Sequence, residues 1–319
     1  MKISKIILIN ILTIITLLIL LEISTRLILK FYFNNSVAGL TERTVNLKYE
    51  PFVMYGPDWK KSFSNIIFKK DDFKIMIIGG STAAGIPEKL LKKYFSEITK
   101  KNISIFNFAF GGYVSKQQLV LLSLFAEDII PDLIINLDGA NDIIHSLRQN
   151  SHGNFFLNKT YDIYLTKPFL APFVWLIQNS QFTNTIFRIY QRNKTPDFKD
   201  KVLFLDSYLN TTSKIKSISN IYSKKYIHIL QPHLYFKNIK SEEEMLFKKY
   251  NYRNNYIEKS YDYISKNILL SNLPNECTFI DGRDLFKNNE NRIFSDDVHF
   301  FDDKGYEVII KEIINCLQY

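Results

Sequence analysis

Cysteine and histidine are scarce in this chain. Of its 319 residues, two are cysteine and five are histidine. Cys277 and Cys316 form no C-x-x-C pair and belong to no Cys/His ligand pattern, so a zinc-type metal site is not supported, and we expect neither metal nor cofactor. Two cysteines are compatible either with buried thiols or with one disulfide in an oxidising compartment. The sequence leaves both alternatives open.

The usual motifs of nucleotide and nucleic-acid binding are also missing. Neither G-x-x-x-x-G-K-[ST] nor G-x-G-x-x-G occurs. Lysine and arginine outnumber aspartate and glutamate by 41 to 32, but the lysines are scattered in pairs through every segment. No arginine-rich helix or aromatic-plus-glycine RNA motif accompanies them. We therefore expect no nucleic-acid partner, and a general bias toward Lys, Asn, Ile and Phe explains the charge better.

The N-terminus carries one long apolar run. Ile6–Leu21 is almost wholly apolar, and the run continues to Leu29 with Glu22 and Arg26 inside it. This length approaches the ~20 residues that a membrane-spanning helix needs. No small-x-small cleavage site follows, which favours an uncleaved signal anchor over residues 1–31. Positive charges on the two sides nearly balance; we expect the remainder to lie in the periplasm or outside the cell.

Short apolar runs alternate with amphipathic stretches over most of the remaining chain. This alternation is typical of βαβ units and predicts an α/β domain with a mostly parallel sheet. The expected strands are Ile75–Ile78, Ile103–Phe108, Leu133–Leu137, Tyr226–Gln231 and Thr278–Ile280. The expected helices are Glu88–Thr99, Lys116–Ile130, Tyr208–Tyr222, a long helix from a Ser241/Glu244 capping box toward Leu270, and a last helix from near Asp303.

The domain boundaries follow from where this alternation starts and lapses. We expect residues 32–72 to be a tether that wraps onto the domain, and residues 73–319 to form the domain itself. An aromatic-rich stretch at about 145–201 interrupts the alternation, and we interpret it as an insertion folded over the carboxyl edge of the sheet. The alternative is that its aromatic side chains form a satellite core.

One stretch organises the chemistry. Phe73–Pro87 reads FKIMIIGGSTAAGIP, so Ser81 follows a buried strand and a glycine turn. A serine in this place is presented at the edge of an α/β sheet where ligands bind. The competing interpretation is that Ser81 merely caps the next helix.

Three further turns supply candidate partners for Ser81. They are Gly111–Gly112, Gly139–Asp142 and Asp296–His299. Acyl transfer by a serine needs a nucleophile, a base, a group that orients the base, and donors for an oxyanion. Ser81, His299 and Asp296 match the first three requirements, while Asn141 and the backbone N–H of Gly112 match the fourth.

At these residues the chain resembles the SGNH hydrolases, also called GDSL-type esterases, of the membrane-anchored bacterial type. GGSTAAG at Gly79–Gly85 is similar to the nucleophile block, NFAFGGYVS at Asn107–Ser115 to the second block, DGAND at Asp138–Asp142 to G-x-N-D, and DDVH at Asp296–His299 to D-x-x-H. The resemblance implies a three-layer αβα, flavodoxin-like fold with a five-stranded sheet. It also implies a Ser81–His299–Asp296 triad and an oxyanion hole from Ser81, Gly112 and Asn141. The usual G-D-S is G-G-S here, so an acidic neighbour of the serine is absent.

The resemblance implies a serine esterase whose substrates are O-acetyl or acyl esters on envelope carbohydrate or lipid. An O-acyltransferase would use the same triad, and a catalytically silent polysaccharide-binding or assembly protein is a rival from another class. Asp297 remains an alternative to Asp296 as the orienting acid. We expect Asp142 to hold the Asn141 loop. Of the other histidines, we expect His228 to be a satisfied core residue, His233 to be structural, and His145 and His152 to belong to the insertion.

Overall fold

We describe a computed structural model of the whole chain. The structure describes residues 2–33, 53, 56–59, 61, 71–148, 167–170, 180, 182–183, 186, 198, 202–238, 243–250, 254–271 and 277–318. The chain divides into two compact units, one made of Met1–Leu47 with Phe156–Thr195 and the other of Lys48–Phe155 with Pro196–Tyr319.

The larger unit contains a five-stranded sheet. Its strands are β1 (Phe73–Gly79), β2 (Ile103–Asn107), β3 (Leu133–Asp138), β4 (Lys225–Leu230) and β5 (Phe279–Asp281). Their order is β2-β1-β3-β4-β5 and every pairing is parallel. This is the flavodoxin-like order, in which the chain reverses its winding direction between β1 and β3.

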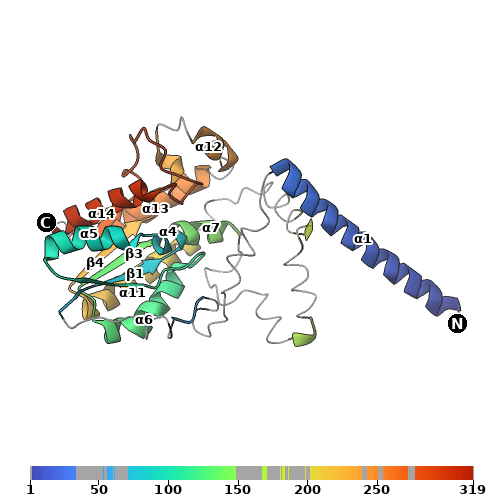
Figure 1. Cartoon of the computed structure of the whole chain (residues 1–319), viewed down its shortest axis with the longest axis horizontal. Coiled ribbons are helices and arrows are strands. Elements are labelled where there is room, and N and C mark those ends of the chain that lie inside the picture. The colour runs from blue at the N-terminus through green and yellow to red at the C-terminus, as the bar shows by residue number, and fades with distance from the viewer. Residues whose placement is uncertain are drawn as a thin grey trace. The chain divides into compact units, whose positions relative to one another are not determined.

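Helices cover both faces of the sheet and complete three layers (Figure 1). On one face Ile75, Ile77 and Ile135 pack with α5 (Glu88–Thr99) and α14 (Asp303–Gln318). On the other face Met76 and Ile134 pack with α6 (Ser115–Ile129) and α11 (Val202–Tyr222). Successive side chains of a strand point to opposite faces, so one apolar run supplies both cores. The predicted α/β class, parallel sheet and layering are confirmed.

The predicted long helix from the Ser241/Glu244 capping box to Leu270 is wrong. The structure has two helices there, α12 (Glu244–Tyr250) and α13 (Asn254–Ser271). Asn254 and Asn255 stand at the start of α13, and asparagine is a poor residue for a helix interior because its side chain competes for backbone hydrogen bonds. Ser241 itself lies outside the described residues.

The alternative left open for the cysteines is decided by the structure, because Cys277 and Cys316 form a disulfide. It joins the segment before β5 to the last turn of α14. Cys316 is buried in the same apolar core as the sheet face that α14 covers. The covalent bond therefore holds both ends of the C-terminal segment against the sheet.

Before β1, two described side chains join the core of the larger unit. Val53 and Trp59 are buried with Phe108 and Tyr113, and Trp59 Nε1 donates a hydrogen bond to Tyr113 Oη at 3.0 Å. The Val53 carbonyl accepts from Gln117 Nε2 at 2.8 Å. These parts of the 32–72 segment therefore pack on the domain.

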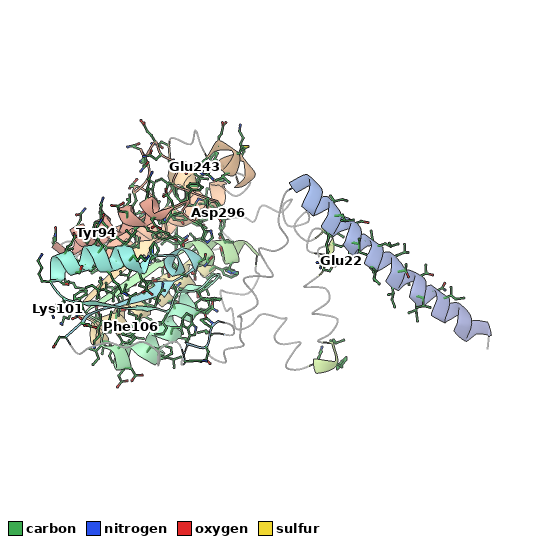
Figure 2. All side chains as sticks on the ribbon, in the orientation of Figure 1. Glu22, Tyr94, Lys101, Phe106, Glu243 and Asp296 are labelled. Atoms are coloured by element: carbon green, nitrogen blue, oxygen red, sulfur yellow. A yellow bond between two sulfur atoms is a disulfide. The ribbon has the colours of Figure 1, made fainter. Side chains whose placement is uncertain are left out.

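The smaller unit contains α1 (Lys2–Phe33), whose residues Ile9–Ile28 are long and apolar enough to cross a membrane. Glu22, labelled in Figure 2, interrupts this apolar surface. Its carboxylate accepts from Arg26 Nε at 2.8 Å, from Ser180 Oγ at 2.8 Å and from the Phe182 backbone N–H at 3.1 Å. Part of the 145–201 stretch is thus hydrogen-bonded to the apolar helix. Its aromatic residues Phe173 and Trp175 lie outside the described residues.

Candidate active site

Ser81 is presented by a tight junction between β1 and the short helix α4 (Ser81–Ala84). At Gly79 a Cβ would stand 2.3 Å from the Leu137 carbonyl oxygen and 2.4 Å from Ala83 Cβ, and its φ of +154° also favours glycine. Only a residue without a side chain lets β1 turn so closely against β3. The N-cap of α4 is Gly80 and no side-chain cap bond is made. The interpretation of Ser81 as a helix cap is therefore wrong.

His299 lies on a short loop that Asp296 organises from within. Asp296 Oδ1 accepts the backbone N–H of Val298 at 2.9 Å and that of His299 at 2.7 Å. An antiparallel bridge between Phe294 and Phe300 closes the base of the loop. These bonds within the loop hold its shape without a contribution from Ser81.

The structure brings Ser81, His299 and Asp296 together although Ser81 and His299 are 218 positions apart. Asp296 Oδ2 lies 2.6 Å from His299 Nδ1, and His299 Nε2 lies 2.6 Å from Ser81 Oγ. A carboxylate only accepts, so Nδ1 carries the imidazole proton and Nε2 is left to accept from the serine hydroxyl. Asp296, labelled in Figure 2, belongs to the segment between β5 and α14.

The electrostatics of this group favour an ionised Asp296. Burial by itself raises the pKa of Asp296, but the His299 hydrogen bond and charge, together with the backbone N–H groups of Val298 and His299, hold it below its ordinary value. Asp297 is not an alternative orienting acid, because its carboxylate lies 3.6 Å from His233 Nε2 instead. Asp296 is the carboxylate that is hydrogen-bonded to the His299 ring.

Asn141 lies directly beside the serine turn. It belongs to α7 (Ala140–Arg148), which follows β3, so Ser81 and Asn141 flank the β1/β3 switch point. Asn141 Nδ2 donates to the Tyr113 carbonyl at 2.9 Å, which uses one of the two N–H groups of the amide. A Cβ on Gly80 would stand 2.5 Å from the same nitrogen. The amide is therefore held against the backbone that carries Ser81.

Gly111 and Gly112 form the glycine pair of the second block. Gly112 has a φ of +80°, a left-handed conformation that favours glycine. A Cβ on Gly111 would be 4.0 Å from Ser81 Cβ, so the pair lies next to the serine. Sequence reasoning singled out Gly112 as the oxyanion donor, and this role stays a prediction.

Asp142 holds the neighbouring turn, as expected. Its carboxylate accepts from the Ser115 backbone N–H at 3.0 Å and from Ser115 Oγ at 2.7 Å. Burial, and then the negative charge of Asp138, raise the pKa of Asp142 to about 7, against the opposing effect of the Ser115 bonds. Asp142 therefore ties the first turn of α6 to the Asn141 helix with a carboxyl group that titrates near neutral pH.

Two of the remaining histidines, His228 and His233, take the structural places expected of them. His228 is buried, with its Nε2 2.8 Å from Asp138 Oδ1 and 3.0 Å from Tyr208 Oη. His233 is buried and its Nδ1 accepts from the Tyr235 backbone N–H at 3.1 Å. His145 lies within α7 rather than beyond it, and His152 lies outside the described residues.

Sequence reasoning missed a buried ion pair that supports the histidine loop. Lys237 pairs with Glu243, both almost fully buried, and Glu243 Oε1 accepts the backbone N–H groups of Ile293 at 2.8 Å and Phe294 at 2.7 Å. Lys237 Nζ also donates to the Asn291 carbonyl at 2.6 Å. Lys237 and Glu243 stand in no recognisable motif, so the sequence gave no signal for this pair.

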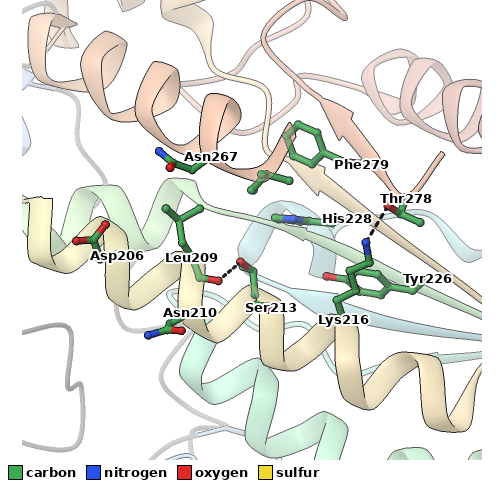
Figure 3. A pocket seen from close by; sticks show the side chains of 12 residues that line it. Asp206, Leu209, Asn210, Ser213, Lys216, Tyr226, His228, Asn267, Thr278 and Phe279 are labelled. Carbon is green, nitrogen blue, oxygen red and sulfur yellow. Dashed lines mark hydrogen bonds between the residues drawn. The ribbon is translucent and has the colours of Figure 1, made fainter. Parts of the chain in front are cut away.

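A separate pocket of about 350 Å³ opens between α11, α13 and the strands β4 and β5 (Figure 3). His228 and Tyr226 lie at its inner side, and Lys216 Nζ lies 3.5 Å from Thr278 Oγ1 at one end. Ser81, Asp296 and His299 do not line it. Among the described residues, no group of three or more His, Cys, Asp or Glu side chains is arranged to hold a metal ion.

No protein-family model and no curated protein matches the chain. Among solved structures, it is similar to a lipase from a goat rumen metagenome, with 16% identity, 76% of this chain and 97% of that chain covered, and a TM-score of 0.45. A putative acylhydrolase from Bacteroides fragilis is similar over 82% and 94% of the two chains, with 12% identity and a TM-score of 0.43. A variant of an acetylxylan esterase from Geobacillus stearothermophilus is similar over 79% and 96%, with 14% identity and a TM-score of 0.43. The identities and TM-scores are low, and these likenesses assign no chemistry to this chain.

Proposed function

We propose that the protein is a serine esterase of the SGNH type that hydrolyses carboxylic esters through Ser81, His299 and Asp296. The observation that carries this proposal is the unbroken chain of hydrogen bonds from Asp296 through His299 to Ser81, with 2.6 Å at each step. These residue types in this order form a nucleophile, a base and an orienting acid. Their place at the β1/β3 switch point, where α/β sheets bind ligands, supports the same conclusion.

In the proposed reaction Ser81 Oγ attacks the ester carbonyl carbon and its proton passes to His299 Nε2. Asp296 stabilises the imidazolium, and the oxyanion accepts from the Ser81 and Gly112 N–H groups and the Asn141 amide. When the bond to the alcohol breaks, His299 returns the proton to the leaving oxygen. A water molecule then gives its proton to His299 and attacks the acyl-serine, which releases the acid and restores Ser81.

The substrates that we propose are O-acetyl or acyl esters on carbohydrate or lipid of the cell envelope. One observation supports attachment to a membrane, and another supports a site outside the cytoplasm. Residues Ile9–Ile28 of α1 are suited to anchor the chain in a membrane, and the Cys277–Cys316 disulfide is typical of an oxidising compartment. Alkaline carbonate extraction tests the anchor, and protease added to cells with an intact cytoplasmic membrane tests the side.

The esterase itself is tested by Ser81→Ala in the full chain. We expect the variant to lose both hydrolysis of aryl esters and acetylated sugars and labelling by an organophosphonate, with an unchanged melting temperature. Ser96→Ala is the matched control, because Ser96 is exposed on α5 and its hydroxyl donates to the Lys93 carbonyl within the same helix. Full labelling of Ser81→Ala would remove Ser81 from the reaction. Acyl transfer to an added sugar in place of water would reassign the reaction to a transferase with the same triad.

A further inference from the structure

Behind the site lies a buried hydrogen-bond bridge that the proposed reaction does not use. Gln231 Nε2 donates to Thr82 Oγ1 at 2.7 Å and to the Val298 carbonyl at 3.2 Å, and Thr82 Oγ1 donates to the same carbonyl at 3.1 Å. Thr82 is 0% exposed and Gln231 is 3% exposed. We call this group the Gln231 bridge. A carbonyl oxygen has two lone pairs, and here both are used.

The two residues that Gln231 joins are the immediate neighbours of the nucleophile and the base. Thr82 follows Ser81 in α4, and Val298 precedes His299. Gln231 itself comes from a third place, just after β4. One side chain therefore connects the turn that carries Ser81 to the loop that carries His299.

Gln231 has a firmly held backbone from which to make this connection. Its N–H donates to the Asp138 carbonyl at the end of β3 at 2.7 Å, and its carbonyl accepts from Tyr261 Oη at 2.8 Å. Thus the bridge is fixed to the sheet and to α13. It is not a contact between surface groups, since the side chains of Thr82 and Gln231 are almost fully buried.

Asp296 cannot fix the separation between the His299 loop and the Ser81 turn. It lies in the same loop as His299 and accepts from the Val298 and His299 N–H groups, so it moves with the loop. It orients the imidazole ring but does not set the distance from the loop to Ser81. Besides the bridge, the loop is tied to the sheet side by the Leu234 N–H, which donates to the Asp297 carbonyl at 2.9 Å.

We infer that Gln231 and Thr82 are positioning residues that hold the Ser81 turn and the His299 loop at the separation needed for proton transfer. The inference rests on the proposed esterase function. A displacement of about 1 Å between reacting groups can cost on the order of 10²-fold in rate. Loss of the bridge should therefore lower turnover while leaving substrate binding nearly unchanged.

The test compares two substitutions of Thr82 in the full chain. Thr82→Val keeps the shape but removes the hydroxyl, and Thr82→Ser keeps the hydroxyl. We expect Thr82→Val to lower kcat for an aryl ester by roughly 10- to 100-fold with KM changed by less than about 3-fold, and Thr82→Ser to restore most of kcat. Rates are normalised to the folded fraction, which is measured by thermal melting. Equal kcat in Thr82→Val and wild type would overturn the inference.

Gln231→Met gives a second arm, because methionine has a similar length and offers no N–H. We expect the same fall in kcat and a matching fall in the rate of phosphonate labelling at Ser81. A lower melting temperature with normal kcat per folded molecule would make the bridge merely structural and overturn the inference. If Gln231→Met does not fold, the Thr82 pair decides alone. Ser81→Ala is measured in parallel. If Ser81→Ala keeps its activity, the proposed function is wrong. If Ser81→Ala is inactive while Thr82→Val has normal activity, only the positioning role is wrong.

Discussion

Gly80 and Asn141 lie so close that a Cβ on residue 80 would stand 2.5 Å from Asn141 Nδ2. This contact gives a physical reason for the G-G-S sequence at the serine turn. The backbone at Gly80, with φ −88° and ψ −158°, is accessible to any residue, so a side chain there would act by crowding the Asn141 amide and not through backbone conformation.

We predict that Gly80→Ala displaces the Asn141 amide and lowers kcat of ester hydrolysis. If the effect acts through Asn141, the same substitution should cost little in an Asn141→Ala background, because contacting residues are not additive. Steady-state kinetics of the two single variants and the double variant measure this coupling. Additive losses would show that Gly80 acts on the site by another route.

Asn141→Ala should lower turnover far more than it raises KM, because a bond to the oxyanion forms only as the carbonyl becomes tetrahedral. Loss of one such donor costs about 10²–10³ in kcat. Asn141→Asp should lose at least as much, since a carboxylate repels the oxyanion. The bond to the Tyr113 carbonyl adds a structural effect of about 1 kcal/mol to the loss. Turnover that stays normal per folded molecule would leave Asn141 with the structural role alone.

Asp142 should make stability depend on pH between about 4 and 7. Its folded pKa of about 7 lies above the ordinary value of about 3.9 for an unfolded aspartate, so the folded state binds the extra proton in this window. Stability from this group therefore falls as pH rises through the window and levels off above it. Urea unfolding of wild type and Asp142→Asn from pH 4.5 to 8 measures the difference. The free energy of unfolding of the variant should increase relative to that of the wild type as pH rises. A difference between the two free energies that does not depend on pH would contradict the prediction.

The Cys277–Cys316 disulfide closes a loop across 39 positions of sequence. From loop-closure entropy, its removal should cost about 3–4 kcal/mol in the free energy of unfolding. We expect this loss in urea unfolding of the Cys277→Ser/Cys316→Ser variant. A reducing agent should destabilise the wild type to a similar extent and leave the variant unchanged. Wild-type protein that is insensitive to reduction would argue against the bond.

The sequence by itself determined the class of fold and where the strands lie along the chain. Ile75–Ile78 and Leu133–Leu137 are short apolar runs that end at glycine, and the structure forms β1 and β3 there. The helix expected at Glu88–Thr99 has the same bounds in the structure. These predictions work because the hydrophobic period and the glycine breaks act locally. The candidate residues Ser81, Asn141, Asp296 and His299 were likewise visible, since each stands in a short motif beside a turn.

Only the tertiary structure decided which distant polar groups meet. It paired Asp296 rather than Asp297 with His299, joined Cys277 to Cys316, and buried Lys237 against Glu243. It also placed Gln231 between Thr82 and Val298. Such pairs leave no periodic trace in the sequence, because a polar side chain is satisfied by whichever partner the folded chain brings within hydrogen-bond distance, and that partner is set by the packing of the whole sheet.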